Sequence, residues 1–134
     1  HLRSWGREGS GAGEFNGPTY CALSRDGRVL FVADTHNHRI VAYDAASGGA
    51  LRYSGCPGSG VSVLSFPYGL ALSRCGRELF VAYPRNGCVV VRAIAEWAAV
   101  RSWTVEGGPF GVGVGPDGRL FVASQDSSQL RKFS

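Results

Sequence analysis

Short apolar runs alternate with glycine, asparagine and aspartate along the whole chain. In the first third, runs rich in β-branched and aromatic residues predict four strands, at 20–24, 29–33, 40–43 and 51–54. Asp26-Gly27 is a hairpin-type turn between the first two. Residues 35–38 form the next turn, in which we expect Asn37 to adopt the left-handed conformation. The pattern therefore predicts an all-β fold of short antiparallel strands.

The same pattern recurs 49 residues later without a gap, because Phe31-Val32-Ala33 matches Phe80-Val81-Ala82. A third copy places Phe121-Val122-Ala123 in register, at an offset of 42 residues that falls to 41 after a one-residue deletion. Three copies in register indicate a tandem repeat. Four strands in each copy of about 40–50 residues are typical of a β-propeller blade.

We therefore expect one domain over 1–134, with blades at 16–54, 66–103 and 108–134. Residues 2–5 match the fourth strands of the first two copies, so they should form the outer strand of a preceding blade. The first strand of each copy is uncharged, which suits the crowded inner position. The fourth strands carry Arg3, Arg52 and Arg101, as a solvated outer strand would.

The first copy reads GEFNGP at 13–18, SRDG at 24–27 and VADTHNHRI at 32–40, and it resembles the NHL repeat. The second copy departs from that pattern with Tyr83 in place of Asp and Gly87-Cys88 in place of His-Arg. The third has Ser124 and Ser127-Ser128-Gln129 at the Asp and Asn-His-Arg positions. The resemblance implies a ring of six blades.

Six blades of this size need roughly 250 residues, so the chain supplies about half of a ring. Half a ring exposes strand edges and an apolar wall. We expect closure by further blades of a longer parent protein, by a second chain, or by a partner that covers the edges. The chain contains no Met, so we interpret it as a piece of something longer.

Composition restricts the possible cellular compartments and classes of partner only slightly. There is no apolar run of about 18 residues and no signal-like start, which predicts no membrane span and a cytoplasmic location. The net charge of +4 permits an acidic partner or RNA, but the charges are dispersed along the sequence. We expect the four cysteines to be reduced, with Cys21 buried in its strand.

His36 and His38 lie beside Asp34 and Arg39, and two interpretations compete for them. Asp34, His36 and His38 are a conceivable metal-ligand set, although the other copies have no counterpart. The favoured interpretation is a structural turn formed by Asp34, Asn37, His38 and Arg39, with Asp34 paired to Arg39 on the surface. The resemblance supports this, because His38 belongs to the family signature. We predict neither a metal nor a cofactor.

A catalytic site in a propeller needs acids, histidines or a metal at the central channel. The residues that lead into the inner strands are Thr19, Tyr68 and Phe110, and none of these can activate water. We therefore predict a non-catalytic protein. The alternative is a lactonase-like or amidating-lyase-like propeller whose catalytic residues lie outside this segment.

Aromatic and arginine side chains in the loops favour a protein-interaction scaffold. The candidate contact residues are Tyr68, Arg74, Tyr83, Arg85 and Phe110. Single-stranded RNA is the second binding hypothesis, with rings stacked on bases and arginines on phosphates, as in some NHL propellers.

Overall fold

A computed structural model describes residues 3–54 and 64–134. Its regular elements are strands, apart from two single-turn 3-10 helices. No helix in this described part is long and apolar enough to cross a membrane. The prediction of an all-β fold is confirmed.

Blade 1 is a four-stranded antiparallel sheet in the order β3-β4-β5-β6. Its strands are β3 (Pro18–Leu23), β4 (Val29–Asp34), β5 (Arg39–Asp44) and β6 (Ala50–Ser54). Each neighbours the next strand in sequence, as the alternation of apolar runs and tight turns predicts. The 3-10 helix η1 (Thr35–Asn37) connects β4 to β5.

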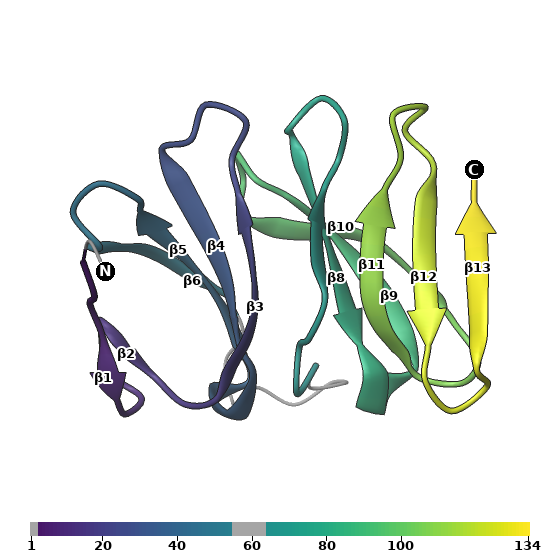
Figure 1. Cartoon of the computed structure of the whole chain (residues 1–134), viewed down its shortest axis with the longest axis horizontal. Helices are drawn as coiled ribbons and strands as arrows, with labels where there is room; N and C mark the ends of the chain where they lie inside the picture. Colours follow the sequence, from purple (N-terminus) through teal and green to yellow (C-terminus); the bar gives the residue numbers. More distant parts are fainter. Residues whose placement is uncertain (1–2, 55–63) are drawn as a thin grey trace.

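Blade 2 repeats this arrangement and blade 3 follows it with three strands (Figure 1). Blade 2 contains β7 (Leu70–Leu72), β8 (Glu78–Tyr83), β9 (Cys88–Ala93) and β10 (Ala98–Thr104), with η2 (Pro84–Asn86) between β8 and β9. Blade 3 contains β11 (Pro109–Val114), β12 (Leu120–Ser124) and β13 (Gln129–Phe133). The three sheets stand side by side, as consecutive blades of a propeller do.

Apolar layers between the sheets hold the blades together. Successive strand residues point to opposite faces, so each sheet contributes one set of side chains to each neighbour. The layer between blades 1 and 2 contains Phe31, Ala33, Ile40 and Ala42 against Leu70, Leu79, Val81, Tyr83 and Val90. The layer between blades 2 and 3 contains Phe80, Ala82, Val89 and Val91 against Val105, Val112, Leu120 and Val122.

The turn after η1 differs from the prediction in one residue. His38, with φ 54° and ψ 37°, takes the left-handed conformation that was expected of Asn37. Its backbone N–H donates to the Thr35 carbonyl at 3.0 Å and ends the helical turn. The equivalent positions in the other blades, Gly87 (φ 62°) and Ser128 (φ 50°), are left-handed as well, so the repeat fixes this geometry for three different side chains.

Two expectations for the start of the chain are corrected. Cys21 is exposed, whereas its repeat equivalent Leu70 is only 2% exposed, because β3 has no preceding blade against its face. The outer strand expected at 2–5 is not formed over residues 3–5. A strand is defined by ladder hydrogen bonds to a neighbouring strand, and residues 3–5 belong to none of the strand pairs among the described residues.

The segment before β3 instead covers the open face of blade 1. It contains a short parallel pair, β1 (Arg7–Glu8) with β2 (Glu14–Phe15). Phe15 packs on Tyr43 with ring centroids 5.1 Å apart. The Arg3 guanidinium donates to the Ala46 carbonyl at 2.7 Å, as that of Arg52 does to the Ala95 carbonyl at 2.9 Å. Residue 3 thus contacts blade 1 as the outer strand of blade 1 contacts blade 2.

Candidate binding surface on the lower rim

The lower rim is the edge of the molecule at the bottom of Figure 1, where η1, η2 and the segments entering the inner strands lie. It carries Tyr68, Arg85 and Phe110 from the predicted contact residues. Arg74 lies in the β7–β8 turn at the opposite edge. The predicted contact residues therefore do not form one surface.

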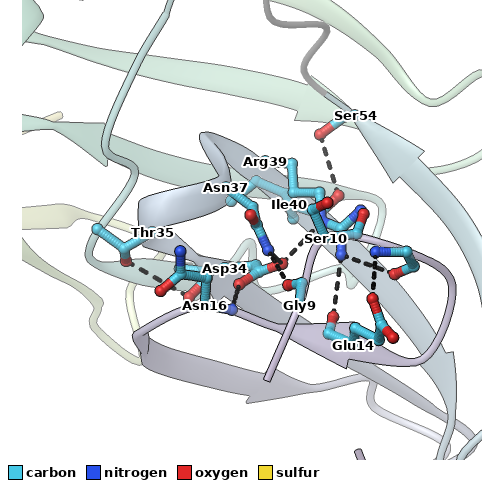
Figure 2. A network of polar contacts seen from close by, with 12 residues as sticks. Gly9, Ser10, Glu14, Asn16, Asp34, Thr35, Asn37, Arg39, Ile40 and Ser54 are labelled. Atoms are coloured by element: carbon cyan, nitrogen blue, oxygen red, sulfur yellow. Dashed lines mark hydrogen bonds and ion pairs between the residues drawn. The ribbon is translucent and has the colours of Figure 1, made fainter. Parts of the chain in front are cut away.

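Asp34 is the centre of a buried polar network on this rim (Figure 2). Its carboxylate is fully buried and accepts a hydrogen bond from the Asn16 backbone N–H at 2.7 Å. It also accepts from Asn37 Nδ2 at 2.9 Å and from Arg39 Nε at 2.7 Å. The expected pair with Arg39 is present but buried, because the segment before β3 covers it. Burying a carboxylate without hydrogen bonds would cost free energy of folding, and these three donors offset that cost.

Arg39 joins that network to the segment over blade 1 (Figure 2). Its guanidinium donates to the carbonyls of Ser10 at 2.9 Å, Gly11 at 3.1 Å and Glu14 at 2.9 Å. The planar group also lies over the Tyr53 ring, 4.9 Å from its centroid. All these partners are structural, so Arg39 holds the start of the chain in place rather than presenting charge to a ligand.

Thr35 links blade 1 to blade 2. Its hydroxyl is fully buried and donates to the Pro67 carbonyl at 2.7 Å. It also lies 2.6 Å from the hydroxyl of Thr19, which leads into the inner strand of blade 1. The segment at 64–68, which enters the inner strand of blade 2, is thereby held against the η1 turn.

Tyr83 is not a surface residue, contrary to the sequence prediction. It is 4% exposed and packs in the layer between blades 1 and 2. Burial raises its pKa to about 12. Tyr83 is buried because it occupies in blade 2 the position that the buried Asp34 occupies in blade 1. Cys88 occupies in blade 2 the position of Arg39, the partner of Asp34. Burial raises the pKa of the Cys88 thiol.

Phe66 is a bulky residue of the rim with a left-handed backbone. Its backbone has φ 52°, a left-handed conformation that is strained for a bulky side chain. The repeat equivalent is Gly17, which has φ 56° without that strain. A phenylalanine therefore occupies a position where the repeat geometry favours glycine.

Cationic and aromatic side chains from two blades surround Phe66. The His38 ring meets it edge-to-face at 4.3 Å between centroids, and His38 Nδ1 accepts the Phe66 backbone N–H at 3.2 Å. The His36 ring lies 6.0 Å away, also edge-on. From blade 2, the Arg85 guanidinium carbon lies 3.5 Å from the ring centroid. We call Phe66, His36, His38 and Arg85 the Phe66 cluster.

Tyr68 and Phe110 form a second aromatic contact further along the rim. Their ring centroids are 4.7 Å apart, and both side chains are half-buried. They enter the inner strands of blades 2 and 3, so their contact bridges these blades. Together with the Phe66 cluster, they place aromatic rings at both junctions of the three blades.

The conceivable metal ligands Asp34, His36 and His38 do not converge on one point in this structure. Within 3–54 and 64–134, no group of three His, Cys, Asp or Glu side chains is placed to hold a metal ion. The donors around Asp34 already occupy its oxygens, while His36 and His38 face Phe66.

Phe66 and His36 were missed as binding candidates from the sequence. The repeat itself contained the signal for Phe66, because a large aromatic residue replaces a glycine of the first copy at an otherwise aligned position. Residues that the copies share maintain the common fold, whereas residues that differ between copies give each blade its own surface. His36 has no comparable signal in the sequence.

Comparison with known structures decides the fold. A candidate 6-phosphogluconolactonase of Bacteroides fragilis aligns with a TM-score of 0.75 and 17% identity, over 88% of this chain and 35% of that one. The β-propeller domain of Cps50 (Swd1) from Myceliophteria thermophila aligns with a TM-score of 0.66 and 18% identity, over 92% and 40%. The fold is a β-propeller.

Hydrazine synthase of Kuenenia stuttgartiensis is a further match, with a TM-score of 0.76 and 23% identity, over 90% of this chain and 33% of that one. The chain thus spans between 33% and 40% of these structures and represents part of a propeller. At such identities the likeness shows the fold alone. No family model matches the chain, and no curated protein matches it.

Proposed function

We propose that the chain is a non-catalytic protein-interaction scaffold of NHL-type blades that binds its partner through the Phe66 cluster. The observation that supports this most strongly is the left-handed Phe66. Strained conformations persist where the surroundings over-determine them, and they concentrate at functional sites. Aromatic and arginine side chains are also the residues that dominate protein interfaces.

The Phe66 cluster favours a protein partner over single-stranded RNA. RNA recognition needs an open ring face on which a base can stack. The Arg85 guanidinium lies over the Phe66 ring and covers one face of it. RNA binding remains the second candidate function, with steep weakening by salt as its distinguishing property.

A catalytic role, lactonase-like or amidating-lyase-like, would require residues outside this segment. The repeat supports further blades of a parent protein, or a second chain, as the source of ring closure to six blades. Cys21, Cys75 and Cys88 are free thiols in the described part of the chain, and a cytoplasmic location is part of this proposal.

The test is quantitative capture from an extract of the source cells with three immobilised proteins: the natural chain, Phe66→Gly, and Val100→Ser. Phe66→Gly restores the residue type of the first copy, so the variant should fold at least as stably. Val100 is 52% exposed on the outer strand of blade 2 and serves as the matched control.

We expect a partner that Phe66→Gly retains about thirtyfold less well, which corresponds to roughly 2 kcal/mol for a hot-spot residue. Val100→Ser should retain it fully, and nuclease treatment should not release it. Equal capture by all three proteins would refute the Phe66 cluster as the binding surface. Release by nuclease, together with steep salt dependence, would establish RNA instead.

A further inference from the structure

The upper rim, opposite the Phe66 cluster, gathers arginines that are far apart in the sequence. Three hairpin turns, at 24–28, 73–77 and 115–119, lie along the top edge of the blades in Figure 1. They contain Arg25, Arg28, Arg74, Arg77 and Arg119, with Asp26 and Asp117 as their acids. Five positive minus two negative charges give these turns a net charge of +3, whereas the whole chain has +4.

The two aspartates are occupied in holding their turns. Asp26 Oδ1 accepts from Ser24 Oγ at 2.6 Å and from the Arg28 backbone N–H at 3.1 Å. Asp117 accepts the Arg119 backbone N–H at 3.1 Å and pairs with the Arg119 guanidinium at 2.7 Å. In blade 2 the equivalent residue is Cys75, so that turn holds two arginines and no carboxylate.

Three guanidinium groups on this rim are available to a partner, and that of Arg28 also interacts electrostatically with Asp26 of its own turn. Arg28, Arg74 and Arg77 are exposed, and their guanidinium groups make no hydrogen bond or ion pair with any residue that the structure describes. The Arg25 guanidinium donates to the Arg74 carbonyl, which joins the turns of blades 1 and 2. The three available groups therefore belong to two turns in direct contact.

The surroundings of these groups suit a peptide better than a nucleic acid. The three turns contain no aromatic side chain on which a base could stack. Leu23 precedes the first turn and is 52% exposed, offering an aliphatic contact beside Arg25. A partner that combines carboxylates with aliphatic side chains matches this surface.

We propose that the upper rim binds an acidic, extended peptide segment of a protein partner, whose carboxylates pair with Arg28, Arg74 and Arg77. Guanidinium groups present two parallel N–H donors that match a carboxylate. The surface is separate from the Phe66 cluster, so either can be tested without the other.

The test is fluorescence anisotropy of a labelled peptide that alternates Glu and Leu, titrated with the full 134-residue chain. The test variant combines Arg74→Ala with Arg77→Ala. Its control combines Arg7→Ala with Val100→Glu, which lowers the net charge equally at exposed positions elsewhere. Phe66→Gly and a labelled single-stranded RNA complete the set.

We expect the natural chain to bind the peptide with an affinity that weakens as salt is added. The Arg74/Arg77 variant should bind about tenfold more weakly, from the loss of two exposed pairs, while the control variant and Phe66→Gly bind as the natural chain does. Absence of peptide binding, or equal weakening by the control variant, would overturn the proposal. Tighter binding of the RNA, lost in the Arg74/Arg77 variant, would overturn it in favour of a nucleic acid.

Discussion

Asp34 is a buried carboxylate, and its contribution to stability depends on the three hydrogen bonds that it accepts. Asp34→Ala leaves the largely buried Arg39 guanidinium beside an apolar side chain, because Arg39 Nε loses the carboxylate with which it pairs. We expect the free energy of unfolding to fall by about 3–5 kcal/mol, as for the removal of one partner of a buried ion pair. Urea denaturation of the natural and variant chains measures this loss.

Asp117→Ala is the matched control for that experiment. Asp117 also pairs with an arginine, but both side chains of the pair are about half exposed. Exposed pairs stabilise by about 0–1 kcal/mol. Equal losses in the two variants would show that the Asp34 network contributes no more than a surface pair.

Tyr43 provides a pH-dependent prediction. Its side chain is fully buried and its hydroxyl makes no hydrogen bond within the described residues, and burial raises its pKa to about 12. The unfolded chain ionises this phenol near about pH 10. Stability from the neutral buried phenol is therefore complete below about pH 10 and is lost as the pH rises towards about 12.

Tyr43→Phe should remove that part of the alkaline loss and leave stability at neutral pH unchanged or slightly higher, since no hydrogen bond is lost. Tyr20→Phe, at an exposed tyrosine, is the control. Chemical denaturation at pH values from neutral to alkaline compares the three proteins. An unchanged alkaline profile for Tyr43→Phe would contradict the burial of this phenol.

Single residues were predictable from the sequence where the repeat constrained them and not elsewhere. The Asp34–Arg39 pair followed from the motif, but its burial did not, because the covering segment belongs to no predicted element. Tyr83 was placed on the surface although it aligns with Asp34. Aligning the copies places Tyr83 at the position of Asp34, but only the structure shows that this position is buried.

Among the elements, blades 2 and 3 approach each other closely where Gly69, just before β7, meets β11. A Cβ atom added to Gly69 would lie 2.3 Å from the Phe110 carbonyl oxygen and 3.0 Å from the Val112 backbone nitrogen. Backbone atoms cannot rotate away as a side chain would. Gly69→Ala should therefore separate blades 2 and 3 locally and lower the melting temperature by several degrees, as expected for a loss of about 1–3 kcal/mol.

Gly113→Ala tests the same substitution on the neighbouring inner strand. A Cβ atom there would meet nothing within 4 Å. Alanine restricts the unfolded chain more than glycine, so this variant should be neutral or more stable by up to about 1 kcal/mol. A similar melting temperature for both variants would contradict the close approach of β7 and β11.

Strand positions were predicted to within one or two residues, because alternation and turn chemistry are local. Exposure was not, because it depends on neighbours that the pattern of one strand does not specify. Cys21 occupies a position that is buried in blade 2 and open in blade 1. Residues 3–5 have the sequence of an outer strand, yet they are not a strand in the structure.

In the whole molecule, blade 3 presents an open face, and the segment before β3 covers the face of blade 1 only in part. Leu130 is 72% exposed, whereas its equivalents Ile40 and Val89 are fully buried between blades. Blade 3 thus presents to solvent the surface that blades 1 and 2 bury against their next neighbour. The first blade exposes Tyr20 and Cys21 at the other end.

We expect the isolated chain to associate through these ends, giving species heavier than its own 14.2 kDa by light scattering. Leu130→Glu should shift the population towards single chains, because it places a charge in the apolar contact. Val100→Glu, on an equally open but outer strand, should not. A natural chain that is monodisperse at 14.2 kDa would contradict the expectation.

The distribution of charge over the fold cannot be inferred from the order of charged residues along the sequence. Arginines 49 residues apart are dispersed along the sequence, yet the repeat brings them to one edge of the fold. The Phe66 cluster forms similarly, from residues 36, 38, 66 and 85 on two blades. A surface assembled across blades becomes predictable only when the copies are superposed.

Hydrogen exchange followed by mass spectrometry can locate the surface of the chain that binds the partner protein, which we propose to be the Phe66 cluster. Amide exchange is compared for the chain alone and with the purified partner from the capture experiment. We expect slower exchange in the complex at 35–38, 64–68 and 84–87, with the outer strand β10 unchanged. Protection confined to β10 or other surfaces, with these three segments unaffected, would contradict it.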